Sequence, residues 1–310
     1  MVLSSESQPS PPSGTASAEA AAMADEACAY PVRAWPGVLL EMLAICGYGI
    51  WMLQGMALAL GIYRSGRNEG LLPLALGAVF ASLGLLVACL RLPRLGEWHG
   101  WRPAQHSRPT REALLVLTTY LPMLAVAGLV RGDNAFWATR LAGAALMLCS
   151  LVSLAYSARS FCTRLPGRAQ SHSHQLSASR VVTAYYGGGL WLWLCLVTED
   201  AGAHPAGTRP WIMALLLLAL LLGLLEGMRW QAFHVSAGQA AADGPRRSCR
   251  SRRYMGALLT YAVPSVVLLL IDLSDAGTWL VGVAAVSCVV GKTIEQHAYE
   301  AALAGHLAPA

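Results

Sequence analysis

Several ionisable residues lie inside or at the edges of long apolar stretches of this sequence. They are Glu41, Glu112, Arg140, Glu226, Asp272, Lys292 and Glu295. A charge in an apolar environment is costly unless it is paired, so each of these residues is a candidate for proton or ligand chemistry. A carboxylate at the edge of such a stretch can accept a proton from a substrate, which is the work of a general base.

A structural role is open for the same residues. Glu112 follows Thr110, a residue suited to cap a helix, and an acid in the first turn of a helix complements the helix dipole. Lys292 and Glu295 are three residues apart and could pair on one helix face. Asp272 could belong to a turn. The sequence leaves both interpretations open.

The histidines and cysteines do not suggest a redox centre. No histidine lies at the centre of an apolar stretch, whereas a haem in a helical bundle is usually held by imidazoles that project into the core. The eight cysteines contain no C-x-x-C pair. We therefore expect no haem and no iron–sulfur cluster in this chain, and no metal site. The motifs of soluble active sites, such as a P-loop, are absent from the sequence.

The apolar stretches predict the fold. Of 310 residues, 55% are hydrophobic and only 13% are charged, about half the charged fraction of soluble domains. Each stretch can cross a hydrocarbon core of ~30 Å as a helix, which satisfies its own backbone hydrogen bonds. We predict an all-α polytopic integral membrane protein, a bundle of about eight transmembrane helices, at about 37–63, 70–90, 112–130, 136–157, 181–198, 211–228, 255–274 and 277–297. Glycines 187–189 should allow a close helix approach, and Pro264 should kink the seventh span.

The regions outside the apolar stretches complete the predicted organisation. Residues 1–30 have the composition of a disordered tail and lack the pattern of a signal peptide. Residues 31–300 hold the eight-helix transmembrane domain, and residues 301–310 form a C-terminal tail. An even number of spans places both termini on one side of the membrane.

Arginine is unevenly distributed between the two sides. The chain has a formal charge of +5, and most arginines fall in the loops at about 91–111, 158–180 and 229–254, on the side of the termini. The positive-inside rule predicts that this side is cytoplasmic, in the inner membrane of a bacterium. Because the arginines lie in short loops and form no continuous soluble face, we expect no nucleic-acid partner.

Four stretches carry a family resemblance. Val-Arg-Ala-Trp-Pro at 32–36 opens the first span, and Leu-Arg-Leu-Pro-Arg-Leu at 90–95 leads through Trp98 and Trp101 to Ser-Arg-Pro-Thr-Arg-Glu-Ala-Leu-Leu at 107–115. Ala-Arg-Ser-Phe at 158–161 closes the fourth span, and Gly-Lys-Thr-Ile-Glu-Gln-His-Ala-Tyr at 291–299 lies in the last. Together, over about 32–300, they resemble the DmsC family, the membrane anchor subunits of dimethyl sulfoxide reductase and related molybdoenzymes.

The resemblance implies a subunit of an oxidoreductase complex that is not itself the catalytic subunit. A ferredoxin-like iron–sulfur subunit and a molybdopterin catalytic subunit would dock on this chain, which would oxidise menaquinol and pass its electrons to the iron–sulfur partner. Glu112 would accept a proton from the quinol or position it. Arg94, Arg102, Arg108, Arg111 and Arg159 would dock the partners.

The sequence departs from the family at one position. The family's quinol-site histidine falls at or beside Arg91, and arginine cannot act as a base. Either His99 or His106 replaces it from the same loop, or Arg91 only orients the quinol oxygen, or the quinol site is altered. Two other functions stay open: a proton-coupled membrane transporter, and a docking scaffold without quinol turnover.

Overall fold

The computed structural model describes residues 34–62, 70–89, 108–130, 136–163, 173–199, 208–237, 246–273 and 278–307. Every regular element within these ranges is a helix, which confirms the all-α prediction for this part of the chain. The elements are α2 (Trp35–Leu60), α3 (Leu71–Cys89), α4 (Arg108–Leu129), α5 (Trp137–Thr163), α6 (Ser173–Glu199), α7 (Thr208–Ala237), α8 (Arg246–Ala257), the π-helix η2 (Leu258–Ala262), α9 (Val263–Leu273) and α10 (Thr278–Leu307).

Within the described residues, five helices are long and apolar enough to cross a membrane, judged by length and composition. The five lie at Trp35–Leu60, Trp137–Arg159, Ser177–Thr198, Arg209–Gln231 and Ser251–Ile271. Two more apolar helices, Leu71–Leu86 and Leu114–Leu129, are shorter. The described residues thus support a helical membrane protein, with five helices that meet the length and composition of a span and not the predicted eight. The last helix, α10, is not among the five, and its second half carries Lys292, Glu295 and Glu300. It continues to Leu307, into the segment predicted as a C-terminal tail, whereas residues 1–30 lie outside the described residues.

The distribution of polar and apolar side chains is that of a protein surrounded by lipid. Large apolar side chains face outward: Leu121 on α4 is 70% exposed, and Leu217 on α7 is 66% exposed. Several charged side chains are buried inside the bundle: Glu226 is only 3% exposed and Lys292 only 6%. A protein surrounded by water would not normally expose so many large apolar side chains while it buries charged ones. The arrangement therefore supports a membrane-embedded helical protein.

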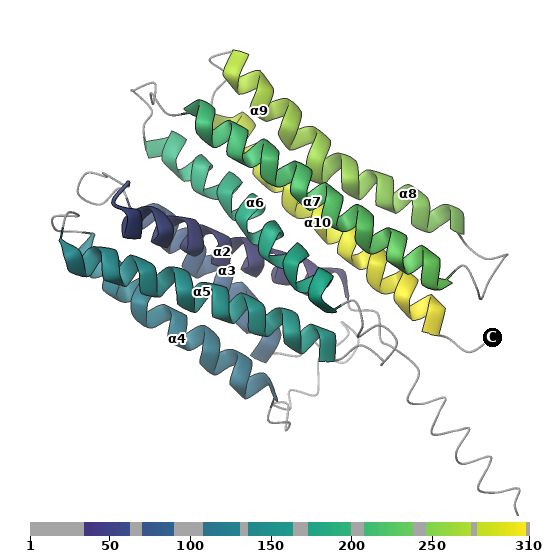
Figure 1. The fold of residues 1–310 in the computed structure, drawn as a ribbon, viewed down its shortest axis with the longest axis horizontal. Helices are drawn as coiled ribbons and strands as arrows, with labels where there is room; N and C mark the ends of the chain where they lie inside the picture. Colours follow the sequence, from purple (N-terminus) through teal and green to yellow (C-terminus); the bar gives the residue numbers. More distant parts are fainter. Residues whose placement is uncertain are drawn as a thin grey trace, which may run out of the picture.

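The helices form two four-membered groups. In the first, α2, α3, α4 and α5 each pack against the next, and α5 packs back on α2. In the second, α6, α7, the continuous α8–η2–α9 helix and α10 follow in the same order, and α10 packs back on α6. Separate hydrophobic clusters fill the two groups for the most part. Figure 1 shows them side by side, with α2 and α6 at the boundary.

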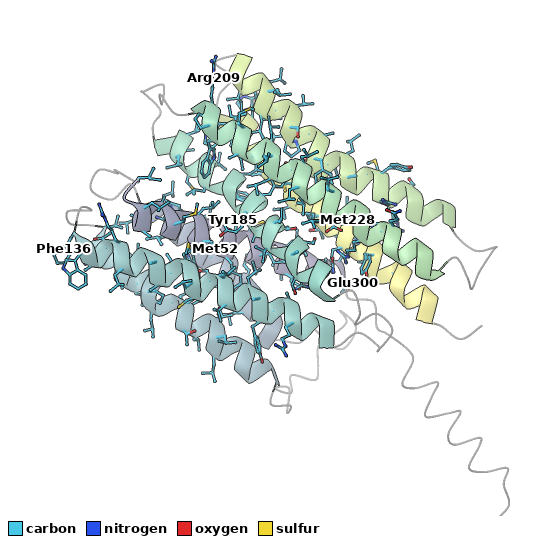
Figure 2. The ribbon with its side chains drawn as sticks, in the orientation of Figure 1. Met52, Phe136, Tyr185, Arg209, Met228 and Glu300 are labelled. Carbon is cyan, nitrogen blue, oxygen red and sulfur yellow. The ribbon has the colours of Figure 1, made fainter. Side chains whose placement is uncertain are left out.

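Consecutive helices alternate in direction, so the bundle has two distinct ends (Figure 1). We call the end where α2 begins and α10 finishes the terminal end, and the opposite end the hairpin end. Phe136 and Arg209 lie near the hairpin end in Figure 2, whereas Glu300 lies toward the terminal end.

Glycines allow the two groups to meet closely. A Cβ added to Gly49 of α2 would collide with the backbone of Ala184, and one added to Gly188 of α6 would lie 2.6 Å from the Cα of Gly49. The backbones of α2 and α6 therefore touch at this crossing, as the glycines at 187–189 predict. In the first group, Gly55 of α2 and Gly143 of α5 pack on each other in the same way.

A π-turn interrupts the seventh helical rod just before Pro264, the position where the sequence predicts a kink. Proline has no N–H, so it cannot donate to the carbonyls of the preceding turn. Two of these carbonyls accept hydrogen bonds from other helices: Tyr186 Oη donates to Thr260 O at 3.2 Å, and Ser287 Oγ donates to Leu259 O at 2.7 Å. The side chains of α6 and α10 thus satisfy the backbone that the proline leaves open.

Candidate functional site

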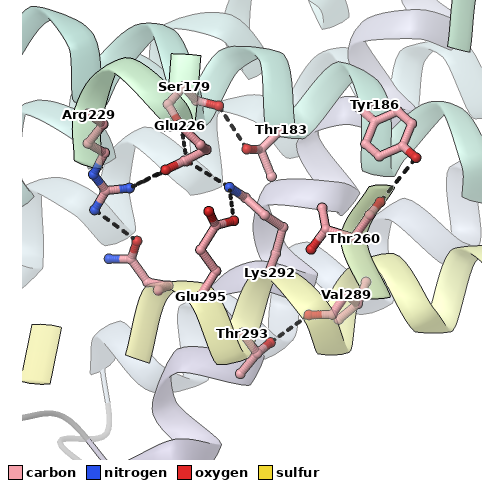
Figure 3. Close-up of polar contacts among 11 residues, drawn as sticks. Ser179, Thr183, Tyr186, Glu226, Arg229, Thr260, Val289, Lys292, Thr293 and Glu295 are labelled. Carbon is pink, nitrogen blue, oxygen red and sulfur yellow. Dashed lines mark hydrogen bonds and ion pairs between the residues drawn. The ribbon is translucent and has the colours of Figure 1, made fainter. Parts of the chain in front are cut away.

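The second helix group holds a network of buried charged side chains, drawn in Figure 3. Glu226 and Arg229 come from α7, one turn apart, so they share a helix face. Lys292, Glu295 and Gln296 come from one face of α10. Because α7 and α10 both pack against α6, these two faces meet in the interior of the group.

Lys292 joins two carboxylates at the centre of the network. Its Nζ donates to Glu226 Oε1 at 2.7 Å and to Glu295 Oε2 at 3.0 Å. Ser179 Oγ on α6 also donates to Glu226 Oε1, at 2.5 Å. The predicted pairing of Lys292 with Glu295 on one helix face is confirmed. The second partner of Lys292, Glu226 on α7, is 66 residues away in the chain and is not predicted by spacing.

The network continues toward the terminal end through Arg229. This guanidinium donates to Glu226 Oε2 at 3.3 Å and to Gln296 Oε1 at 3.3 Å. Gln296 Nε2 in turn donates to Glu300 Oε1 at 3.1 Å. Arg229 also lies over the ring of Tyr299, 3.6 Å from its centroid, a cation–π contact. Polar side chains therefore run without a break from Lys292 to Glu300.

The network is deeply buried and its central charges balance. Glu226, Arg229, Lys292 and Glu295 are each at most 7% exposed. Two carboxylates face two cations, which is the condition under which buried charges are tolerated. The arrangement fixes the side chains of α7 and α10 relative to each other and supplies carboxylates that can exchange protons.

Two hydroxyls extend this polar region toward the π-turn. Tyr261 lies near enough to Lys292, Glu226 and Glu295 to interact with them electrostatically. The Tyr261 hydroxyl and Thr260 Oγ1 are buried atoms without a hydrogen-bond partner among the described residues. Buried polar groups usually have a partner, so these two hydroxyls stand out beside the charged network.

The boundary between the helix groups has its own ion pair. Arg180 on α6 lies 2.7 Å from Glu41 Oε1 on α2, and both side chains are mostly buried. Arg180 also donates to Ser157 Oγ on α5 at 3.3 Å. Arg140 has a different role, because its guanidinium packs on Gly61, where α2 finishes at the hairpin end. A cation there complements the carbonyl end of the helix.

The residues expected to bind quinol are only partly visible. Arg91, His99 and His106 lie outside the described residues. Glu112 lies on α4 near the terminal end, but its side chain, like that of Asp272, is outside the described part. Of the docking residues, Arg94 and Arg102 lie outside the described ranges, Arg108 and Arg111 are described only by their place on α4, and Arg159 is exposed on α5.

Three details of the sequence interpretation are wrong. The third helical rod, α4, begins at Arg108, so Thr110 lies inside it and is not its N-cap. Arg180 and Arg229, assigned to loops, are buried on α6 and α7. The helices extend past the apolar runs because ion pairs allow charged residues to continue them inside the bundle. The spacing of Glu226 and Arg229 is the signal that could have revealed this.

The known proteins give no independent assignment. The described residues contain no group of histidine, cysteine and acidic side chains that could hold a metal ion. Comparison with protein-family models, with curated proteins and with solved structures finds no match to this chain.

Proposed function

We propose that this chain is the membrane anchor and quinol-oxidising subunit of a molybdopterin oxidoreductase of the dimethyl sulfoxide reductase type. The observation that carries the proposal is the loop that resembles DmsC, with Glu112 on the first turns of α4 at the terminal end. Arg159, on α5, lies at the same end of the bundle. Proton acceptor and docking cations thus share one end, as coupling of quinol oxidation to a docked partner requires.

The proposed membrane arrangement uses all eight helical rods as spans. The exposed apolar faces of α4, α5, α7 and α9 support it, because they need lipid or protein to cover them. In α10, the charged residues face α7 and α6, so they do not prevent this helix from crossing. The terminal end is then the side on which the iron–sulfur subunit docks, and the arginine distribution places it in the cytoplasm of a bacterium.

The proposed reaction balances two electrons and two protons. Menaquinol binds near the start of α4 and is oxidised to menaquinone. One quinol oxygen gives its proton to the Glu112 carboxylate, and the other proton leaves through the loop that contains Arg91, His99 and His106. The two electrons pass to the iron–sulfur subunit and from there to the molybdopterin subunit. This chain needs only to position the quinol and accept its protons.

The test is quinol-dependent electron transfer in membranes that contain the full complex. Glu112→Gln keeps the size of the side chain and removes its basicity. We expect the rate with a menaquinol analogue to fall by about 10²-fold or more, a typical contribution of a general base. The matched control is Glu199→Gln at the last residue of α6, at the hairpin end, which should keep the wild-type rate.

The outcomes separate the competing functions. Normal quinol-dependent reduction in the Glu112→Gln variant would refute the assigned role of Glu112. Co-purification of both soluble subunits without any quinol-dependent reduction would leave a docking scaffold. Absence of both soluble partners from the purified protein would refute the anchor proposal altogether.

One observation favours a second candidate, a proton-coupled transporter. The two helix groups follow the same order of packing, they meet at the Gly49–Gly188 crossing, and the second group holds buried charged residues. Paired groups that move against each other are a common architecture of secondary transporters. Substrate-dependent proton uptake by the purified chain in liposomes, without any soluble partner, would favour this candidate over the anchor.

A further inference from the structure

The charged network lies on helices that the proposed quinol site does not use. We propose that Glu295, held by Lys292 against Glu226, is a proton-binding site that exchanges protons with the solution at the terminal end of the bundle. On loading, a proton from water bonds to a Glu295 carboxylate oxygen. On release this O–H bond breaks and the proton returns to water, so no electron moves. The proposal does not rest on quinol oxidation.

The two carboxylates of the network differ in their hydrogen-bond donors. Glu226 accepts hydrogen bonds from Ser179, Lys292 and Arg229. In the part of the chain that the structure describes, the hydrogen-bond donor to Glu295 is Lys292. Lys292 Nζ also donates to Glu226, and that hydrogen bond is the shorter of the two, 2.7 Å against 3.0 Å. Protonated Glu295 would leave Lys292 paired with Glu226. Glu295 is therefore the carboxylate that can gain a proton while the rest of the network keeps its contacts.

The surroundings of Glu295 contain charged and titratable groups on three elements. Lys292 and Glu300 lie on α10 itself, Glu226 and Arg229 on α7, and Tyr261 on η2. Arg180 of α6 is engaged with Glu41 of α2 at the group boundary. Such a site, with both signs of charge in a low-dielectric interior, responds to proton binding by a change in pairing and needs no change of fold.

The hydrogen-bonded line that starts at Glu295 leads toward the terminal end. There, Arg229, Gln296 and Glu300 continue it along α7 and α10, and it finishes at Glu300, a buried carboxylate in the last part of α10. Toward the hairpin end, the described polar side chains nearest the network lie at the π-turn. They are Tyr261 and Thr260 themselves, and Tyr186 and Ser287, whose hydroxyls donate to its carbonyls. An apolar core lies beyond them. That core consists of Leu190, Trp193, Leu222, Leu268, Val281 and Ala284. Among the described residues, the continuous hydrogen-bonded line from Glu295 thus leads toward the terminal end, and we expect protons to reach Glu295 from that end.

A purely structural network is the competing explanation, and physical chemistry does not favour it. Replacing buried ion pairs by apolar residues is often neutral or stabilising, so a network of this size is weak evidence for a role in stability. Five buried charged side chains, with two hydroxyls beside them that have no hydrogen-bond partner among the described residues, are better explained by proton exchange. The difference between the explanations is measurable, because only a proton site changes protonation while the protein stays folded.

The experiment is an infrared pH titration of the full chain in lipid nanodiscs. A protonated, buried carboxyl group has a C=O stretching band that an ionised one lacks. We expect such a band to appear as the pH is lowered, in the range where the helices remain folded. The band should vanish in Glu295→Gln and persist in Glu41→Gln, the matched control in which the carboxylate pairs with Arg180.

A second variant provides a readout that a structural role would not move. Lys292→Met removes the ammonium that favours ionised Glu295, so the band should appear at a higher pH than in the wild type. If Glu295→Gln does not fold, Glu295→Asp keeps a carboxyl group and should displace the band. No band in the folded wild type, or an unchanged band in both Glu295 variants, would overturn the proposal. Either result is independent of Glu112.

Discussion

Removal of the Lys292 ammonium should be among the most destabilising substitutions in this protein. In the wild type, one cation lies 2.7 Å from Glu226 and 3.0 Å from Glu295. In Lys292→Met, Glu226 keeps Ser179 and Arg229, but Glu295 loses its donor. Leaving a buried charge without its partner typically destabilises a protein by about 3–5 kcal/mol, and we expect a loss in that range.

The loss should depend on pH and on Glu295. As the pH falls, the folded variant binds a proton on Glu295 more readily than the unfolded chain does, so the deficit relative to the wild type should shrink. Addition of Glu295→Gln to Lys292→Met should recover about 2 kcal/mol, since the unpaired charge is gone. The matched control is Arg159→Met, an exposed cation on α5, which should change stability by no more than about 0.5 kcal/mol.

The assay is denaturant unfolding of the purified chain in mixed micelles, followed by tryptophan fluorescence. Trp230 packs against Tyr299 near the network, with ring centroids 5.7 Å apart, so its emission should report on this region. A Lys292→Met variant within about 1 kcal/mol of the wild type at neutral pH would refute the reasoning. It would mean that the two carboxylates do not depend on Lys292.

Three further experiments test the packing of the fold. Gly188→Ala should destabilise the protein by more than about 2 kcal/mol because its Cβ would press on α2, whereas Gly223→Ala, with open space around it, should be neutral or stabilising in thermal unfolding. Glu41→Arg should weaken the boundary between the helix groups, and Arg180→Glu in the same chain should restore part of the melting temperature. Tyr186→Phe should cost about 1 kcal/mol, since it removes the hydroxyl that bonds the π-turn; an unchanged stability would contradict that contact.

Much of the fold could be predicted from the sequence because lipid-facing helices obey few physical constraints. Each must be apolar over a fixed length and must satisfy its own backbone, so the apolar runs locate the helices. Their ends are less predictable. Charged residues such as Arg180 and Arg229 would end an apolar run, but the helices continue through them because Glu41 and Glu226 pair with them.

The candidate site was less predictable for a different reason. The ion pair between Lys292 and Glu295 lies within one helix and follows from their spacing. The second partner of Lys292, Glu226, comes from another helix. All the apolar stretches are alike in composition, so nothing in the sequence says which two lie together. That information depends on helix order around each group, and on glycine contacts such as Gly49–Gly188 that decide which backbones touch.

The central claim is that the start of α4 binds menaquinol through Glu112, and direct binding tests it most simply. A menaquinol-analogue inhibitor would be titrated calorimetrically into the protein, purified with any soluble partners that accompany it. We predict one saturable site, weakened about tenfold in Glu112→Gln, the loss of a charge-assisted hydrogen bond, and unchanged in Glu199→Gln. Absence of saturable binding to the wild type, or equal affinity in the Glu112→Gln variant, would contradict the claim.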